Sequence, residues 1–152
     1  NTLFSGLTMD TDLALLYTEG NDKVKEELNN YYQVNEDTLL NNYDNIYKRY
    51  KNAYKRVNYS NSLWINSEDI GISDEAKKIA DNKLHFDIKN KKFSNSLNEM
   101  NNWITKKSHG KVKGSLTQGD INEANSVYIS TLYFNEEWKG KYEKTFIFLK
   151  KV

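Results

Sequence analysis

The sequence predicts an α+β fold in which several helices precede the most convincing strand. Between Thr38 and Val57, apolar and aromatic residues recur at spacings of three and four, which is typical of one face of a helix. Residues 57–66 instead alternate as a strand does, and Ser126–Phe134 has the composition of a strand buried on both faces. This order favours an α+β arrangement over regular βαβ alternation.

The composition indicates a packed core and little global charge. The chain has 152 residues, of which 38% are hydrophobic and 13% aromatic, including 11 tyrosines. This length allows one domain or a piece of a larger one. The net charge of +1 gives no reason to expect nucleic acid as a partner. There is no cysteine, which excludes disulfides and thiolate metal sites, and no apolar run is long enough to span a membrane.

The first half of the chain is predicted to be mainly helical. Thr8 or Asp10 is expected to cap a helix that runs through Tyr17, and Gly20 is expected to end it. A second short helix begins at Asp22, and the helix at 38–57 follows. In the strand at 57–66, one face is predicted to carry Tyr59, Asn61, Leu63 and Ile65.

The second half is predicted to alternate between helices and strands. A helix opens at Ser73, a short extended piece covers 85–88, and a helix runs from Phe93 to Lys107. His109-Gly110 is expected to end this helix, since glycine tolerates the left-handed conformation there. A turn-rich linker at 114–125 leads to the strand that begins at Ser126, and one more strand is expected from Thr145.

The residue pattern gives no support for catalysis. The two histidines, His85 and His109, have no metal-ligand spacing, and the glycines at 110–119 lack the strand–turn–helix context of a phosphate loop. Adjacent carboxylates such as Glu136-Glu137 do not face each other on a helix or strand, so they are interpreted as solvated. We therefore expect neither an enzyme nor a protein with a cofactor or a metal.

One basic cluster allows two interpretations. Lys48, Lys51, Lys55 and Arg56 fall on the polar part of the helix predicted at 38–57, and Lys48 and Arg56 are predicted to share a face. The cluster is either a site for a polyanion such as a glycosaminoglycan or an ordinary solvated face.

Five collinear stretches resemble the serpin family. They are "NTLFSGLTM", "LALLYTEGNDK", "NSLWIN", "NEMNNWITKKSHGKVKGSL" and "VYISTLYFNEEWKGKY", and together they span nearly the whole chain. The resemblance implies that 1–152 is one serpin-like domain fragment, from helix B to just past the central strand of sheet A. Helix A and the reactive-centre-loop part are then expected to be absent, and later segments would complete the sheet.

The resemblance also implies candidate site residues. Ser5, Thr8 and Ser130 are similar to the "shutter", where small polar groups bond beneath the opening sheet, and Trp138 is similar to the "breach", where loop insertion begins. The sequence departs from the family pattern, since Gly6 replaces a proline and Ser130 replaces an asparagine. Simple packing is the alternative role for each residue.

The function implied by the resemblance is suicide inhibition of a serine or cysteine protease by loop insertion into sheet A. We expect the chain as it stands to lack this activity, because no bait residues are present. The alternative is a non-inhibitory, serpin-derived binding module that pairs with another chain at an open sheet edge. The basic helix corresponds to one that some serpins use for glycosaminoglycans, and the resemblance implies an extracellular location.

Overall fold

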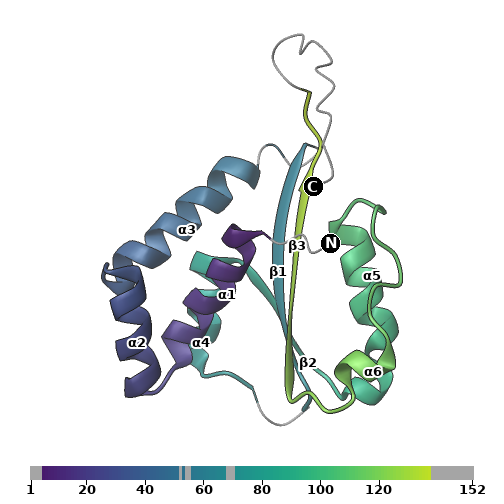
Figure 1. Cartoon of the computed structure of the whole chain (residues 1–152), viewed down its shortest axis with the longest axis horizontal. Coiled ribbons are helices and arrows are strands. Elements are labelled where there is room, and N and C mark those ends of the chain that lie inside the picture. Colours follow the sequence, from purple (N-terminus) through teal and green to yellow (C-terminus); the bar gives the residue numbers. More distant parts are fainter. Residues whose placement is uncertain (1–4, 52, 54–55, 68–70, 138–152) are drawn as a thin grey trace, which may run out of the picture.

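The structure is a computed structural model that describes residues 5–51, 53, 56–67 and 71–137 (Figure 1). It confirms the α+β prediction, with helices on both faces of a mixed sheet. In chain order the elements are α1 (Gly6–Glu19), α2 (Asp22–Tyr32), α3 (Glu36–Lys51), β1 (Val57–Ile65), α4 (Asp74–Ile79), the π-helical turn η1 (Ala80–Leu84), β2 (Phe86–Asn90), the 3-10 turn η2 (Phe93–Asn95), α5 (Leu97–Lys107), α6 (Gln118–Ile121) and β3 (Ser126–Phe134).

The described sheet has the strand order β2-β1-β3, so β1 lies in its centre. β1 runs parallel to β2, with Asn61 opposite Phe86, and antiparallel to β3, with Asn61 opposite Ser130. Residues 58–64 of β1 are all buried. The strand pairs with β3 along its length and with β2 from Asn61 onward, and helices lie on both faces of the sheet. The prediction that 58–66 and Val127–Phe134 share a sheet is confirmed.

The prediction that the strand at Ser126–Phe134 is buried on both faces is wrong for β3. Tyr128, Leu132 and Phe134 are 39%, 47% and 66% exposed. Within the described residues, β3 pairs with β1 alone, so one long side of the strand has no neighbour. The apolar composition of β3 therefore exceeds what its present burial explains.

One hydrophobic core lies between the sheet and the helices α1 and α3. Leu15 and Leu40 come from these helices, Leu84 from η1, and Leu63 and Phe86 from the sheet. Ile65 also packs against this core, which confirms the predicted shared face of Leu63 and Ile65. In Figure 1, α1 and α3, which contribute to this core, lie to the left of β1.

A second core lies on the opposite face, where α5 packs against the sheet. Trp64 is fully buried there beside Met100, Trp103 and Ile129. The Trp103 indole Nε1 donates a hydrogen bond of 2.7 Å to the Asp87 carboxylate of β2. This packing confirms the predicted contact between the helix at Phe93–Lys107 and the two strands.

Two predicted helix bounds are wrong. α1 begins at Gly6 with Ser5 as its N-cap, so neither Thr8 nor Asp10 caps it. The helix predicted to reach Val57 ends at Lys51, although its periodic pattern continues. Val57 instead starts β1 opposite Phe134, because pairing in the sheet overrides the local helical pattern there.

Other predicted bounds agree more closely with the structure. Gly20 and Ser73 cap α1 and α4 as expected, and the short extended piece is β2. The helix predicted from Phe93 is divided into η2 and α5, and His109 and Gly110 stop it with φ values of 53° and 77°. The linker contains α6, which a Thr117–Asp120 capping box opens. The strand predicted from Thr145 lies outside the described residues.

Candidate functional site

The two candidate residues at the start of α1 make only local hydrogen bonds. The Ser5 hydroxyl accepts the Thr8 backbone N–H at 3.4 Å, and the Thr8 hydroxyl donates to the Ser5 carbonyl at 3.0 Å. Thr8 is buried, at 6% exposure. The first bond satisfies a backbone N–H that the first turn of a helix leaves without a partner. The Ser5 carbonyl also accepts the Met9 N–H at 3.2 Å.

Ser130 bonds to a residue that the sequence analysis did not single out. Its hydroxyl donates to the two carboxylate oxygens of Asp12 at 3.1 and 3.0 Å. Asp12 lies on α1 and Ser130 on β3, so the contact ties the helix to the strand at the edge of the described sheet. The structure thus joins Ser130 to α1 through Asp12 rather than through Ser5 or Thr8.

Three more polar residues surround this contact. The hydroxyls of Thr11 and Tyr59 are hydrogen-bonded to each other. Asn61, directly opposite Ser130 in the register, is 2% exposed. Its amide is near enough to the Tyr59 hydroxyl to lower the pKa of that group, but neither polar atom of Asn61 makes a hydrogen bond of ordinary geometry among the described residues. A buried amide without partners is costly, so a polar group placed beside Asn61 would stabilise this region.

A helical spacing could have revealed the α1 residues of this region in the sequence. Thr8, Thr11, Asp12 and Leu15 follow the i, i+3, i+4, i+7 pattern of one helix face. Leu15 is in the core, so the polar residues that share its face must also turn toward the sheet. We call Thr8, Thr11, Asp12, Tyr59, Asn61 and Ser130 the polar cluster.

Burial sets the electrostatics of the polar cluster. It raises the pKa of the Asp12 carboxyl from 3.8 to about 6, and the hydrogen bond from Ser130 offsets part of this rise. Burial also raises the pKa of the Tyr59 hydroxyl to about 12. At neutral pH an ionised carboxylate therefore lies beneath the sheet at an energetic cost.

Among the described residues, no strand pairs with the side of β3 that faces away from β1. Hydrogen bonds from Asn66 N–H to the Asn125 carbonyl and from Asn135 N–H to the Arg56 carbonyl, at 2.8 and 2.7 Å, bracket the β1–β3 ladder. In an antiparallel ladder, bonded pairs alternate with unbonded ones. The even-numbered residues of β3, such as Ser130 and Leu132, therefore direct their N–H and C=O groups away from β1.

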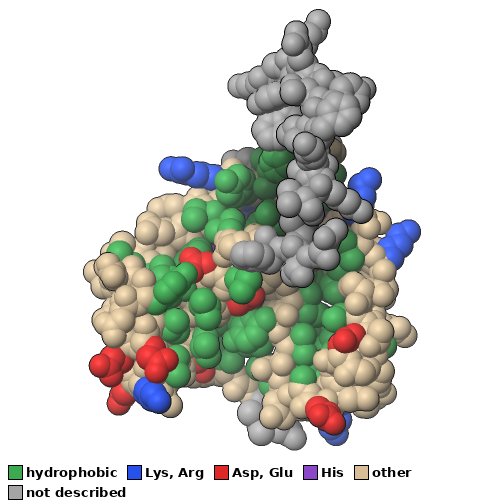
Figure 2. Space-filling model, viewed as in Figure 1, with side chains coloured by type: hydrophobic (Ala, Val, Ile, Leu, Met, Phe, Trp, Pro, Cys, Tyr) green, Lys and Arg blue, Asp and Glu red, His purple; other side chains and the backbone are tan. Residues whose placement is uncertain are grey.

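Two adjoining hollows lie between β3 and the segment that follows α5. One, of about 410 Å³, is lined by Ile104, by 127–132 and by residues of 108–116. The other, of about 390 Å³, is lined by Ser108, Lys111, Val112 and 132–135. In the space-filling view, hydrophobic side chains gather over the middle of this face, where Figure 1 places α1 and β3 (Figure 2). We call the free side of β3 with these hollows the β3 edge.

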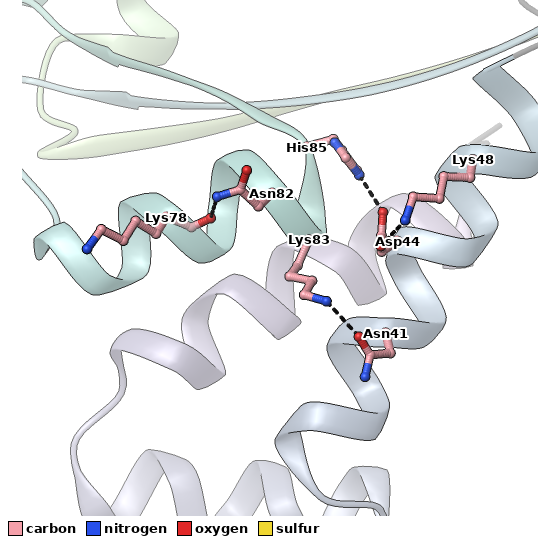
Figure 3. Close-up of polar contacts among 7 residues, drawn as sticks. All are labelled: Asn41, Asp44, Lys48, Lys78, Asn82, Lys83 and His85. Carbon is pink, nitrogen blue, oxygen red and sulfur yellow. Dashed lines mark hydrogen bonds and ion pairs between the residues drawn. The ribbon is translucent and has the colours of Figure 1, made fainter.

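The structure divides the predicted basic cluster. Lys48 and Lys51 lie on α3, whereas Arg56 lies in the turn beyond it and pairs with Glu136 at 3.2 Å. The predicted shared face of Lys48 and Arg56 is therefore wrong, because α3 ends between them. Lys48 bonds to Asp44 at 2.6 Å, as Figure 3 shows. Lys55, and the breach candidate Trp138, lie outside the described residues.

The described residues contain no group of three or more histidine or acidic side chains arranged to hold a metal ion. Within the same residues, no helix has the length and apolar character that a membrane span requires.

A comparison with family models gives a match to "Serpin (serine protease inhibitor)" over residues 1–150. The chain belongs to the serpin family. The family resemblance found in the sequence is thereby confirmed, and with it membership of a family of protease inhibitors rather than of enzymes.

Solved serpins share the fold of this chain. AtSerpin1 of Arabidopsis, in its native stressed conformation, matches with a TM-score of 0.80 and 17% identity, over 95% of this chain and 39% of that one. The thermophilic serpin tengpin, in its native state, matches with a TM-score of 0.77 and 21% identity, over 95% and 38%. This chain thus spans about two fifths of the length of the solved serpins that it matches.

A curated relative shares a shorter stretch. Antithrombin-III of Mus musculus is 41% identical over 44 residues, which are 28% of this chain and 10% of that protein.

Proposed function

We propose that this chain forms the strand-accepting part of a serpin-type inhibitor of serine or cysteine proteases. The observation that carries the proposal is the β3 edge, which has free backbone groups, hollows beside it and an apolar composition that exceeds its burial. A strand added there would pair with β3, as extended segments do at exposed sheet edges. It would also lie directly beside Ser130, whose neighbour across the β1–β3 ladder is Asn61.

The proposed mechanism uses this edge as the end point of the inhibitory reaction. A protease cleaves a loop of the inhibitor, and the loop enters the sheet beside β3 while still joined to the enzyme. Main-chain pairing and the burial of Tyr128, Leu132 and Phe134 supply the driving force. The polar cluster, with Ser5 at the start of α1, takes the shutter role in this proposal, and Trp138 the breach role.

We propose further that residues 1–152 alone do not inhibit. In this proposal residues 1–152 supply the accepting strand β3, and the bait loop that a protease cleaves is not among the described residues. The 152-residue polypeptide should be mixed with a panel of serine and cysteine proteases and analysed on a denaturing gel. We expect no complex that survives denaturation, and a protease-dependent covalent band would contradict this part of the proposal.

The second candidate function is a non-inhibitory binding module that uses the same edge. Exposed Leu132 and Phe134 favour it, since natural proteins rarely leave an apolar strand edge uncovered. Light scattering should then show the mass of the 152-residue polypeptide rising with concentration. Leu132→Lys should suppress the rise, whereas Tyr31→Lys, at an exposed tyrosine on α2, should not. A monomer at all concentrations would contradict self-pairing.

An extracellular location is part of the proposal and is supported by membership of the family alone. Recovery of the protein encoded by the full gene from the medium of the producing cells would support it, and strict retention within the cells would contradict it.

A further inference from the structure

A separate cavity of about 340 Å³ lies between the end of α3 and the start of β1. Its walls come from four elements and the residue before β2. They comprise Tyr47, Tyr50 and Lys51 of α3, residues 57–60 of β1, His85, Asp87 of β2 and Lys107 of α5. This cavity is on the β2 side of the sheet, so it is distinct from the β3 edge.

Within the described residues, one residue near the start of β1, Tyr59, directs backbone groups without a strand partner toward this cavity. The odd-numbered residues of β1 direct their backbone N–H and C=O groups toward β2, as the 3.0 Å bond from Lys91 N–H to the Ile65 carbonyl shows. β2, however, pairs with β1 only from Asn61 onward. The Val57 N–H bonds to the Ala53 carbonyl at 2.8 Å. The Tyr59 N–H and C=O have no hydrogen-bond partner among the described residues, and such a strand edge is a template for a further extended chain.

Contacts with neighbouring side chains fix His85 and Tyr47, which form another wall of the cavity. His85 adopts a left-handed conformation with φ 56°, and its ring stacks on Tyr47 with centroids 3.7 Å apart. The His85 Nε2 lies 3.1 Å from the Asp44 carboxylate, which also accepts Lys48 (Figure 3). The hydrogen bond from Lys48, followed by that from His85, keeps the pKa of Asp44 below its usual range. Two stacked rings therefore form a fixed, flat surface beside the strand edge.

The charges around the cavity leave a positive excess. Asp87 is compensated, since Lys107 Nζ lies 3.0 Å from it and the Trp103 indole donates to it. Lys51, at the end of α3, has no ion-pair partner among the described residues. A ligand that carries a carboxylate would therefore be favoured at the α3 end of the cavity.

We propose that this cavity binds a short extended peptide with an acidic side chain. The peptide main chain pairs with Tyr59 and continues the line of β2, while its carboxylate contacts Lys51. The free backbone favours a peptide over a sulfated sugar, because a sugar would leave the Tyr59 N–H and C=O without a regular partner. The proposal does not depend on the inhibitory function, since it concerns the opposite side of β1.

The test uses two libraries of blocked pentapeptides, randomised at four positions, with a central glutamate in one and a central lysine in the other. Each is titrated into the isotope-labelled 152-residue polypeptide, and the Tyr59 amide is followed by NMR. We expect the glutamate library to shift this amide in a saturable way and the lysine library to do so weakly. Lys51→Gln should weaken the glutamate response about two- to fivefold, the range of an exposed charge pair.

Matched controls separate this contact from general charge. Arg49→Gln removes an exposed cation from α3 that does not line the cavity, and it should leave the response unchanged. A glutamate library N-methylated on every peptide nitrogen cannot donate from its main chain, so it should fail. A Tyr59 amide that does not move at millimolar library, or that responds equally to the N-methylated library, would overturn the proposal. If a heparin fragment shifts the NMR signals of Lys51 and the peptides do not, the peptide proposal is overturned in favour of a sugar site.

Discussion

Among single residues, Asp12 should have the clearest effect on how stability depends on pH. Its folded pKa of about 6 lies above the ordinary value of 3.8, so the folded state holds the proton more tightly than the unfolded state. The corresponding stabilisation is complete below about pH 4 and is lost as pH rises through 6. Ionised Asp12 is thus a cost at neutral pH that the Ser130 bonds only partly offset.

Asp12→Asn should remove this dependence. The amide can still accept the Ser130 hydroxyl but cannot ionise, so the variant should gain stability relative to the parent at pH 7.5 and not at pH 4.5. Chemical denaturation at both pH values measures this difference. Glu123→Gln, at an exposed acidic residue after α6, serves as the control and should not reproduce it. A variant that is equally destabilised at both pH values would contradict the assigned burial of the charge.

The predicted basic cluster gives a second prediction at the scale of single residues. If Lys48, Lys51, Lys55 and Arg56 form a polyanion site, changing all four to serine should lower retention on a heparin column, and salt should weaken the retention of the parent. Lys51 should contribute most among the described three, because Lys48 and Arg56 already pair with carboxylates. Serine at the exposed Lys77 and Lys78 of α4 is the control. If the parent and the fourfold variant elute at the same salt concentration, the cluster is an ordinary solvated face and not a polyanion site.

At the scale of elements, the attachment of α5 depends on Trp103. Its ring packs with Trp64, Met100 and Ile129, and its indole N–H bonds to Asp87. Trp103→Ala should lower the free energy of unfolding by about 3–5 kcal/mol. Trp103→Phe keeps most of the ring and loses only the hydrogen bond, so its loss should be smaller. An unfolding midpoint that Trp103→Ala leaves unchanged would contradict the packing of α5 on the sheet.

Local patterns explain which elements could be predicted. The faces of α1, α3 and α5 follow spacings within a few residues, and glycine at 20 and 110 marks helix ends. The end of α3 could not be found in this way, because Val57 leaves the helical pattern only by pairing with Phe134, far along the chain. The contact between Asp12 and Ser130 likewise joins residues 118 positions apart, and a single sequence contains no local signal for it.

At the scale of the whole molecule, the part of the sheet that the structure describes has two different edges. The β3 edge is long and apolar, and it is flanked by hollows that suit a full added strand. The free part of β1 beyond β2 is short and lies beside Lys51 and two stacked rings. β1 is buried from Asn58 to Trp64 and lies between the two edges.

The central claim, that β3 offers a free edge to an added strand, is tested most directly by hydrogen exchange of its backbone amides. Ile129 and Thr131 bond to β1, whereas Tyr128, Ser130 and Leu132 direct their N–H groups away from it. In the dilute 152-residue polypeptide we predict slow exchange for the first two and fast exchange for the other three. At millimolar concentration, where chains can pair along the edge, the three fast amides should become protected. Equal protection of all five amides in the dilute monomer would contradict the account, because it would mean that β3 is already paired on both sides.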